Sequence, residues 1–397
     1  MWTITESAKC ASALAGRRVC IIRNTSVEYD KRTREIARLL AGNGAEVTVL
    51  AVDVEGRRPD LGEGVELRQA GPGEPSRHPW RPLRIARNLL RSRRQHRLLV
   101  AEARGTGADV FHCMNVDTLL QGFLAARGRP VVYDSREHFA TTGSYRRRRR
   151  WWWLLKERLL VPRCAAVLTV SQPIAEDLAR RYSIPTPTVI YNGCEACVAS
   201  AEPVHRPMRF LHLGKLFFDR HVDEMVLAMI ALRGRAILTV QGWGDAERSL
   251  RELVAEQDFD DTVRLAGPCP PQEVVACASA HDVGLMNIKP ETRNLEWSAG
   301  NKLFEYMAAG LAVLVPGFPV MREIVEKADC GLLFEPLGVT ELVERMTWLV
   351  EHPDEVERMK RNALAAAAEY SWEAQSPKLV SVYEKALGRD SHGRENG

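Results

Sequence analysis

Residues 301–310 read Asn-Lys-Leu-Phe-Glu-Tyr-Met-Ala-Ala-Gly, and the apolar run Leu-Ala-Val-Leu-Val follows at 311–315, directly before Pro316. The first segment predicts a short helix that ends in Gly310, because glycine often closes helices. The apolar run predicts a buried strand. A helix that leads into such a strand is typical of α/β proteins, which present polar groups at the ends of their sheets. Lys302 and Glu305 stand near the helix start, where an anionic ligand can bind.

Short apolar runs alternate with segments of helical period on both sides of this stretch, which predicts parallel strands joined by crossover helices. The predicted strands lie at 19–22, 47–50, 110–112, 130–133, 167–170 and 189–191, and at 210–213, 237–240, 263–265, 283–286, 312–314 and 331–334. A polar stretch separates the two sets, and 397 residues are too many for one ordinary core. The sequence therefore predicts two doubly wound, Rossmann-like domains that face each other across a cleft.

The predicted segments are a poorly structured leader at 1–16, an amino-terminal domain at 17–195, a linker at 196–207, a carboxy-terminal domain at 208–371, a helix at 372–387 that can cross back to the first domain, and a disordered tail at 388–397.

Charge is divided unevenly along the chain. The net charge is +4, but residues 1–195 hold 33 Lys and Arg against 20 Asp and Glu, and the remainder holds 22 against 31. A basic front half favours an acidic partner, such as an anionic membrane surface, a phosphorylated substrate or nucleic acid. The nine cysteines are scattered, mostly in apolar runs, as reduced cytosolic thiols usually are. No run of about 18 apolar residues occurs, so we predict a cytoplasmic, soluble or peripheral protein.

Several common enzyme motifs are missing. No GxGxxG follows the first predicted strand, which disfavours a dinucleotide dehydrogenase. Neither GxxxxGK[ST] nor HExxH is present, which disfavours a P-loop NTPase and a zinc peptidase.

Polar groups and glycines instead follow the strands of the second half. Gly214 and Lys215 come after one strand and Arg220 comes just before a helix, so two cations can neutralise a diphosphate without a metal. A solvated loop is the alternative interpretation. Gly242 and Gly267 follow the next two strands, where glycine permits close approach of a ligand but also suits an ordinary turn.

Lys302 and Glu305 are three residues apart and share nearly one helical face. The carboxylate can accept both hydroxyls of a ribose while the lysine lies toward phosphate. An ordinary ion pair between the two side chains is the alternative.

The order of these segments closely resembles that of retaining GT-B glycosyltransferases of the glycosyltransferase-4 type, over roughly residues 17–387. The resemblance rests on 301–316, on Gly214 to Arg220, on the glycine turn 242–244 and on Ala266-Gly267. The front-half segments that match this family are 30–32, 111–112, 132–135, 170–171 and 190–193.

The resemblance implies roles for individual residues. Lys215 and Arg220 bind the donor diphosphate and stabilise the charge of the leaving group without a metal. Glu305 holds the ribose. The remaining implied donor contacts are Gly214, Gly242, Gly267, Glu296, Lys302 and Leu303. His112 lies near the donor sugar or the acceptor and counts with the catalytic residues, and the implied chemistry is sugar transfer with retention of configuration.

Three positions depart from the family pattern. Relatives often have glutamate at the position of Trp297, so that Glu296 is the nearest acid here. They often have histidine at the positions of Arg136, which precedes Glu137, and of Met114. These departures bear on sugar and acceptor choice and on activity itself.

A basic aromatic segment stands out in the front half. Five arginines, 146–150, precede Trp151, Trp152 and Trp153, and 81–97 holds seven more arginines among leucines. Tryptophan beside arginine at this density predicts an interfacial segment, with Arg146, Arg148, Trp151 and Trp152 on lipid headgroups. Core helices with solvated arginines are the alternative, and RNA binding is disfavoured.

Together these patterns predict a metal-independent, cytoplasmic glycosyltransferase at the inner face of the membrane. It has no cofactor, takes a nucleotide-sugar as substrate and acts on a glycan, lipid-linked or small-molecule acceptor, without a nucleic-acid partner. The alternatives are an inactive nucleotide-binding or regulatory protein of the same fold and a sugar-nucleotide epimerase, although no acid and base pair for epimerisation can be assigned.

Overall fold

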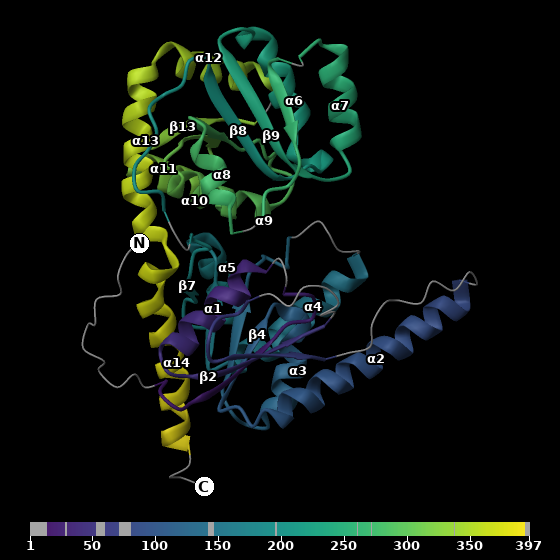
Figure 1. Cartoon of the computed structure of the whole chain (residues 1–397). Helices are drawn as coiled ribbons and strands as arrows, with labels where there is room; N and C mark the ends of the chain where they lie inside the picture. Colours follow the sequence, from purple (N-terminus) through teal and green to yellow (C-terminus); the bar gives the residue numbers. More distant parts are fainter. Residues whose placement is uncertain are drawn as a thin grey trace. The chain divides into compact units, whose positions relative to one another are not determined.

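The computed structural model describes residues 14–27, 30–52, 60–70, 81–141, 147–194, 197–259, 261–270, 272–336 and 338–393, with the side chains of 81–89, 147–149 and 389–393 left undescribed. The chain divides into two compact units (Figure 1). Unit 1 lies within Met1–Ala140, Ser144–Ile190 and Ser376–Gly397, and unit 2 comprises Thr141–Gly143 and Tyr191–Gln375.

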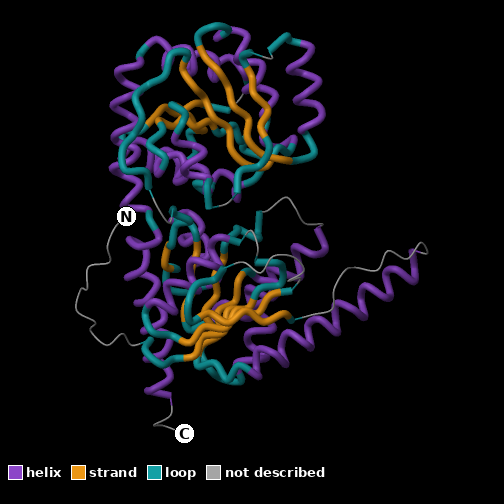
Figure 2. Tube along the Cα trace, viewed as in Figure 1, coloured by secondary structure: helices purple, strands orange, loops and turns teal. Residues whose placement is uncertain are grey.

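Unit 1 is built on a parallel sheet in the order β3-β2-β1-β4-β5-β6-β7, with helices on both faces (Figure 2). Its strands are β1 (Arg18–Ile22), β2 (Glu46–Ala51), β3 (Val65–Gln69), β4 (Val110–Met114), β5 (Val131–Ser135), β6 (Ala166–Thr169) and β7 (Thr188–Val189). The central strands β4 and β5 are buried at every residue, because both faces of a parallel sheet are covered. This arrangement confirms the predicted doubly wound domain.

The helices of unit 1 are α1 (Lys31–Gly42), α2 (Arg81–Gly105), α3 (Val116–Ala126), α4 (Arg147–Leu160), α5 (Gln172–Tyr182) and the part of α14 (Trp372–Gly393) from Ser376 on. Asp30 begins α1, because its carboxylate accepts a hydrogen bond from the Thr33 N–H at 3.2 Å. No described helix is long and apolar enough to cross a bilayer.

Unit 2 repeats the architecture with a parallel sheet in the order β10-β9-β8-β11-β12-β13. Its strands are β8 (Met208–Lys215), β9 (Ala236–Trp243), β10 (Val263–Ala266), β11 (Val283–Leu285), β12 (Ala312–Pro316) and β13 (Gly331–Phe334). Alternate residues of a strand enter different cores: Phe210 joins one apolar cluster and Leu211 the other. The period of two with both faces buried explains the continuous apolar runs seen in the sequence.

The helices of unit 2 are α6 (Val222–Ala228), α7 (Glu247–Glu256), α8 (Val274–Ser279), α9 (Arg293–Glu296), α10 (Asn301–Ala308), α11 (Pro319–Ala328), α12 (Val339–Glu351), α13 (Pro353–Ala367) and the start of α14. Helix α10 ends just before Gly310, whose φ of +70° is the left-handed conformation that glycine adopts readily. Strand β12 follows, so the helix and strand predicted from 301–316 are confirmed.

Four sequence expectations differ from the structure. Within the predicted leader, Leu14 is completely buried, because it packs into unit 1. The predicted linker packs on unit 2, where the Val198 N–H donates to the Ala308 carbonyl at 2.9 Å. The predicted tail is partly helical, since α14 runs to Gly393 and a single glycine at 388 costs too little to end it. Strand β3 was not predicted, because its half-exposed, polar sequence lacks an apolar run.

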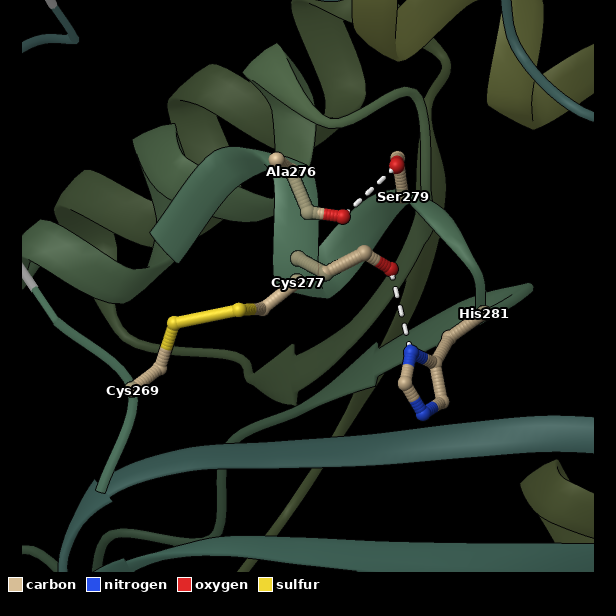
Figure 3. The surroundings of a disulfide bond; sticks show 6 residues. Cys269, Ala276, Cys277, Ser279 and His281 are labelled. Carbon is tan, nitrogen blue, oxygen red and sulfur yellow. Dashed lines mark hydrogen bonds between the residues drawn. A yellow bond between two sulfur atoms is a disulfide. The ribbon is translucent and has the colours of Figure 1, made fainter. Parts of the chain in front are cut away.

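One pair of cysteines is oxidised, contrary to the expectation of reduced thiols. Cys269, in the segment after β10, forms a disulfide with Cys277 of α8 (Figure 3). Nearby, Ser279 Oγ donates to the Ala276 carbonyl at 2.9 Å. The sequence could not reveal this pair, because the turn that brings the two cysteines together has no spacing signature. The other described cysteines form no disulfide.

Candidate functional site

The predicted donor residues of unit 2 lie at one edge of its sheet, where parallel strands end. Gly214 and Lys215 are the last two residues of β8, Gly242 is the penultimate residue of the neighbouring β9, and Gly267 directly follows β10. Arg220 ends a short 3-10 helix, Phe218–Arg220, that follows β8. The strand order β10-β9-β8 therefore places these positions side by side.

The start of α10 packs against the end of β8. Gly214 has a φ of +104°, and a Cβ there would lie 2.9 Å from Lys302 Cε, so the lysine stem runs over the Gly214 backbone. Lys302 Nζ lies 3.2 Å from Nε2 of His212, a buried residue of β8. Burial, Lys302 and Arg220 together lower the pKa of His212, which keeps the imidazole neutral and able to accept from the ammonium.

The electrostatics of Lys302 indicate an anion site. Burial, followed by the positive charge of Arg220, lowers the pKa of Lys302 to about 7, although Glu305 and Asp219 act in the opposite direction. A cation held in this way gains much from an anionic ligand, because an added negative charge offsets both desolvation and repulsion. In α10 itself no side chain caps the first turn, so backbone N–H groups remain for a ligand.

The two cations predicted for the diphosphate differ in exposure. Lys215 is exposed, and its ammonium lies 5.6 Å from the centroid of the Phe217 ring. The Arg220 side chain is 24% exposed, with Nε 3.6 Å from Asp219 Oδ1. Because Arg220 also acts on Lys302, three of the predicted donor residues (Gly214, Arg220 and Lys302) belong to one cluster with Glu305.

The glycines at the end of β9 and just after it have a structural explanation. A Cβ on Gly242 would overlap the carbonyl oxygen of Gly214, and one on Gly244 would overlap that of Leu216. These glycines therefore permit the close approach of β8 and β9 at the end of their pairing. At Gly267 a Cβ would meet open space, so nothing in the described structure requires glycine there.

Two further predicted donor contacts lie apart from the cluster. The Leu303 side chain is completely buried in the core, so the donor contact predicted for this residue would use its backbone N–H. Glu296 is half-buried at the end of α9. Trp297 follows it, with the Arg293 guanidinium 5.6 Å from the ring centroid.

Unit 1 has a charged cluster at the carboxyl edge of its own sheet. Arg136, after β5, donates to Asp30 at 2.6 Å, and Arg23, after β1, lies 2.9 Å from the same carboxylate. Burial would raise the pKa of Asp30, but the charges of Arg136 and Arg23 outweigh it and leave the pKa below its usual value. Glu137 is half-buried, and its carbonyl accepts from Ser135 Oγ at 3.2 Å.

His112 is enclosed inside unit 1, and its predicted catalytic role stays a prediction. The side chain has no exposed surface, its Nδ1 lies 2.6 Å from the Tyr383 hydroxyl, and its Nε2 lies 3.6 Å from Asp134. Asp134 in turn pairs with the buried Arg32 at 2.7 Å. This network joins β4, β5, α1 and α14 and leaves no surface on the imidazole for a substrate.

Sequence reasoning missed other polar groups at the same edge. Asn24 donates to the half-buried Asp117 at 3.2 Å, and burial raises the pKa of that carboxyl. Asn115, directly after β4, has a φ of +71°, which is uncommon for a residue with a side chain. All three follow predicted strands, so the rule that identified Lys215 could have found them too.

The basic aromatic segment is helix α4. Arg146 lies outside the described residues and only the backbone of Arg148 is described, so their predicted lipid contacts stay predictions. Trp151 and Trp152 are 59% and 57% exposed and meet edge to face, whereas Trp153 packs on Phe139. Two indoles of α4 are thus exposed, and the interfacial role of this segment stays a prediction.

Comparison with known families matches each half of the chain. Residues 31–196 match the family described as Glycosyltransferase Family 4, and residues 199–365 match the family described as Glycosyl transferases group 1. Among curated proteins, the chain is 28% identical over 191 residues to D-inositol 3-phosphate glycosyltransferase of Thermobispora bispora, a match over 45% of this chain and 43% of that protein. It is 24% identical to MMP alpha-(1->4)-mannosyltransferase of Mycolicibacterium hassiacum, over 48% of this chain and 43% of that protein.

These two matches span less than half the length of the relatives. A longer one, at 22% identity, covers 76% of this chain and 81% of alpha-D-kanosaminyltransferase of Streptomyces kanamyceticus.

Solved structures show a similar fold. Sucrose-phosphate synthase of Thermosynechococcus elongatus has a TM-score of 0.75 at 17% identity, covering 94% of this chain and all of that one. HepE of Anabaena, solved with UDP, has a TM-score of 0.70 at 16% identity, covering 93% and 99%. At these identities the likeness concerns the fold alone, and it confirms the predicted GT-B architecture.

Proposed function

Because the chain belongs to the group 1 glycosyltransferases with a Glycosyltransferase Family 4 amino-terminal half, we propose that unit 2 binds a nucleotide-sugar and that unit 1 binds the sugar acceptor. Transfer proceeds with retention of configuration and without a metal ion. The supporting observation is the cation cluster of unit 2, in which the pKa of Lys302 is lowered to about 7 by burial and by Arg220.

The cluster suits a diphosphate leaving group. As the bond between the sugar and the phosphate breaks, negative charge grows on the diphosphate, and preorganised cations stabilise that charge without the cost of reorienting solvent. Arg220 and Lys302 supply fixed charges, and the exposed Lys215 supplies a mobile one. These side chains therefore take the place that a metal ion holds in other diphosphate sites.

Glu305 is placed to hold the ribose. It is half-buried one helical turn from Lys302, near enough to raise that pKa by its charge. A carboxylate can accept from both ribose hydroxyls, while the backbone N–H groups of the first turn of α10 face phosphate.

The donor proposal is tested by thermal unfolding of the full chain with a panel of nucleoside diphosphates and their sugar derivatives. We expect at least one compound to raise the melting temperature, because a ligand that binds only the folded state stabilises it. Glu305→Gln should reduce the shift, and EDTA should leave it unchanged. The donor proposal is abandoned if no compound in the panel shifts the melting temperature.

An inactive nucleotide-binding protein is a second candidate, favoured by Trp297, where relatives often have glutamate, and by Arg136, whose guanidinium is held by Asp30. Active enzymes of this kind release some nucleoside diphosphate without an acceptor. Binding without any release from the preferred nucleotide-sugar, even with mixed acceptors, would favour this second candidate.

We also propose that α4 docks unit 1 on an anionic membrane at the inner face of the cell, where a lipid-linked acceptor is available. The exposed Trp151 and Trp152 and the net positive charge of the front half support this proposal. Trp151→Ser with Trp152→Ser should reduce sedimentation with vesicles that contain phosphatidylglycerol. Unchanged sedimentation would count against it.

A further inference from the structure

A cavity of about 440 Å³ opens among helices α2, α3 and α4 of unit 1. Helix α3 packs against both α2 and α4. The volume falls within the range of roughly 300–1,000 Å³ typical of small-molecule sites. It is lined by residues that neither the donor site nor the cluster around Asp30 uses.

The wall of the cavity holds an unsatisfied polar group. Gln121 of α3 is only 2% exposed, and its Nε2 contacts His96 Nδ1 of α2. Gln121 Oε1 has no hydrogen-bond partner among the described residues. Burial, with the charge of Lys156, lowers the pKa of His96, so the imidazole is neutral and can accept from the amide. A buried acceptor of this kind is satisfied when a ligand donates a hydroxyl hydrogen.

The rim of the cavity is cationic. Arg97 and Arg104 line it from α2 and Lys156 from α4. Arg104 donates to the Leu124 carbonyl at 2.8 Å, and no carboxylate of the described residues forms an ion pair with any of these three side chains. Burial lowers the pKa of Lys156 although the charge of Asp117 raises it, so the ammonium is half-buried without direct neutralisation.

The mouth of the cavity is apolar. Leu120 and Leu124 of α3 are 39% and 49% exposed, and Val100 of α2 lies beside them. Exposed leucines next to unpaired cations and a buried hydrogen-bond acceptor suit an amphiphile better than a free anion, because only an amphiphile covers the leucines.

We propose that this cavity binds the headgroup and the first part of the acyl chain of an anionic phospholipid whose headgroup carries a free hydroxyl. The phosphate pairs with Lys156, Arg97 and Arg104, the hydroxyl donates to Gln121 Oε1, and the chain lies on Leu120 and Leu124. Such a site adds recognition of one lipid class to the general attraction between arginines and an anionic surface.

This inference rests on unit 1 alone. The thermal shift by nucleoside diphosphates concerns unit 2 only, and vesicle sedimentation concerns α4 tryptophans that do not line the cavity. Failure of the lipid site and failure of the proposed transferase function are therefore distinguished.

The experiment titrates the full chain by calorimetry with soluble dihexanoyl phosphatidylglycerol. Dihexanoyl phosphatidylcholine lacks the net negative charge and the headgroup hydroxyl, so it tests whether binding needs them. Glycerol 3-phosphate lacks the acyl chains, so it tests whether binding needs the chain. We expect saturable binding of the phosphatidylglycerol, with both other compounds at least about tenfold weaker. Equal binding of phosphatidylcholine would overturn the proposal in favour of unspecific apolar contact, and equal binding of glycerol 3-phosphate would overturn it in favour of a free-phosphate site.

Matched variants separate the cavity from surface charge. Lys156→Met and Arg158→Met each remove one cation from α4, but the exposed Arg158 does not line the cavity. We expect Lys156→Met to weaken phosphatidylglycerol binding about tenfold and Arg158→Met to leave it within twofold. Equal effects of the two variants would overturn the proposal.

Gln121→Met serves as a check on folding. It removes the unsatisfied oxygen together with the Nε2 contact to His96 Nδ1, so its melting temperature shows whether the variant is folded, and its affinity for phosphatidylglycerol should fall. Unchanged affinity in a folded Gln121→Met variant would remove Gln121 from the site and overturn the hydroxyl contact.

Discussion

Proton uptake on ligand binding follows from the depressed pKa of Lys302, which is about 7 in the free protein. A nucleoside diphosphate bound beside Lys302 and Arg220 restores the ammonium, so the pKa returns toward its ordinary value of about 10.4. The free lysine is then about half protonated at pH 7 and about one tenth protonated at pH 8. Binding should take up about 0.5 proton at pH 7 and about 0.9 at pH 8, and affinity should weaken about fivefold between them.

Calorimetry in two buffers with different ionisation enthalpies measures this uptake directly. The ligand's own phosphate titrates near pH 6, so the protons that it exchanges on binding fall steeply in number between pH 7 and pH 8. The proton uptake by Lys302 rises over the same interval, so the two sources are separated. Lys302→Arg is the matched control, because a guanidinium keeps the charge and does not deprotonate. Its proton uptake should vanish at pH 8. Wild-type binding without proton uptake at pH 8, and with equal affinity at pH 7 and pH 8, would refute the placement of Lys302 beside the diphosphate.

Three stability measurements test other parts of the structure. Burial raises the pKa of Glu157 to about 7, above its unfolded value of about 4.3, so stability should fall by about 4 kcal/mol as the pH rises through that window. In urea unfolding, Glu157→Gln should flatten the dependence of the free energy of unfolding on pH. An equally steep dependence in this variant would reject Glu157 as its source. Asp134→Asn leaves the buried Arg32 without its ion-pair partner and should lower the free energy of unfolding by about 3–5 kcal/mol. A loss below about 1 kcal/mol would contradict this. Gly242→Ala should lose about 1–3 kcal/mol through overlap with a neighbouring backbone carbonyl, whereas Gly267→Ala should change stability by less than about 0.5 kcal/mol. Equal losses in these two variants would contradict the geometry.

Local sequence patterns predicted the strands that are buried on both faces. Strand β12 was clear because every residue from Ala312 to Pro316 is buried, which requires an apolar run. Strand β3 was not predicted, because an edge strand with half-exposed residues has no such apolar run. The helix and strand at 301–316 were predicted from glycine closure followed by an apolar run, and both depend only on neighbours in the chain.

The site was predictable where its members lie at the end of a strand or at the start of a helix. Gly214, Arg220 and Lys302 were identified by position, and the structure brings them together with Glu305. His112 also lies in a strand, yet its surroundings depend on Tyr383, 271 residues away, which no local pattern contains. Long-range packing of this kind decides which polar residue of a strand faces a ligand and which is enclosed.

The preference of unit 2 for a nucleoside diphosphate over the matching monophosphate tests the central claim most directly. The base that gives the largest thermal shift is used, and both dissociation constants are measured for wild type and for Arg220→Met. A site built around Arg220 and Lys302 should bind the diphosphate at least about tenfold more tightly, and the variant should lose most of that preference. Equal affinity of the two nucleotides for the wild-type protein, or an unchanged preference in Arg220→Met, would contradict a diphosphate site at the start of α10.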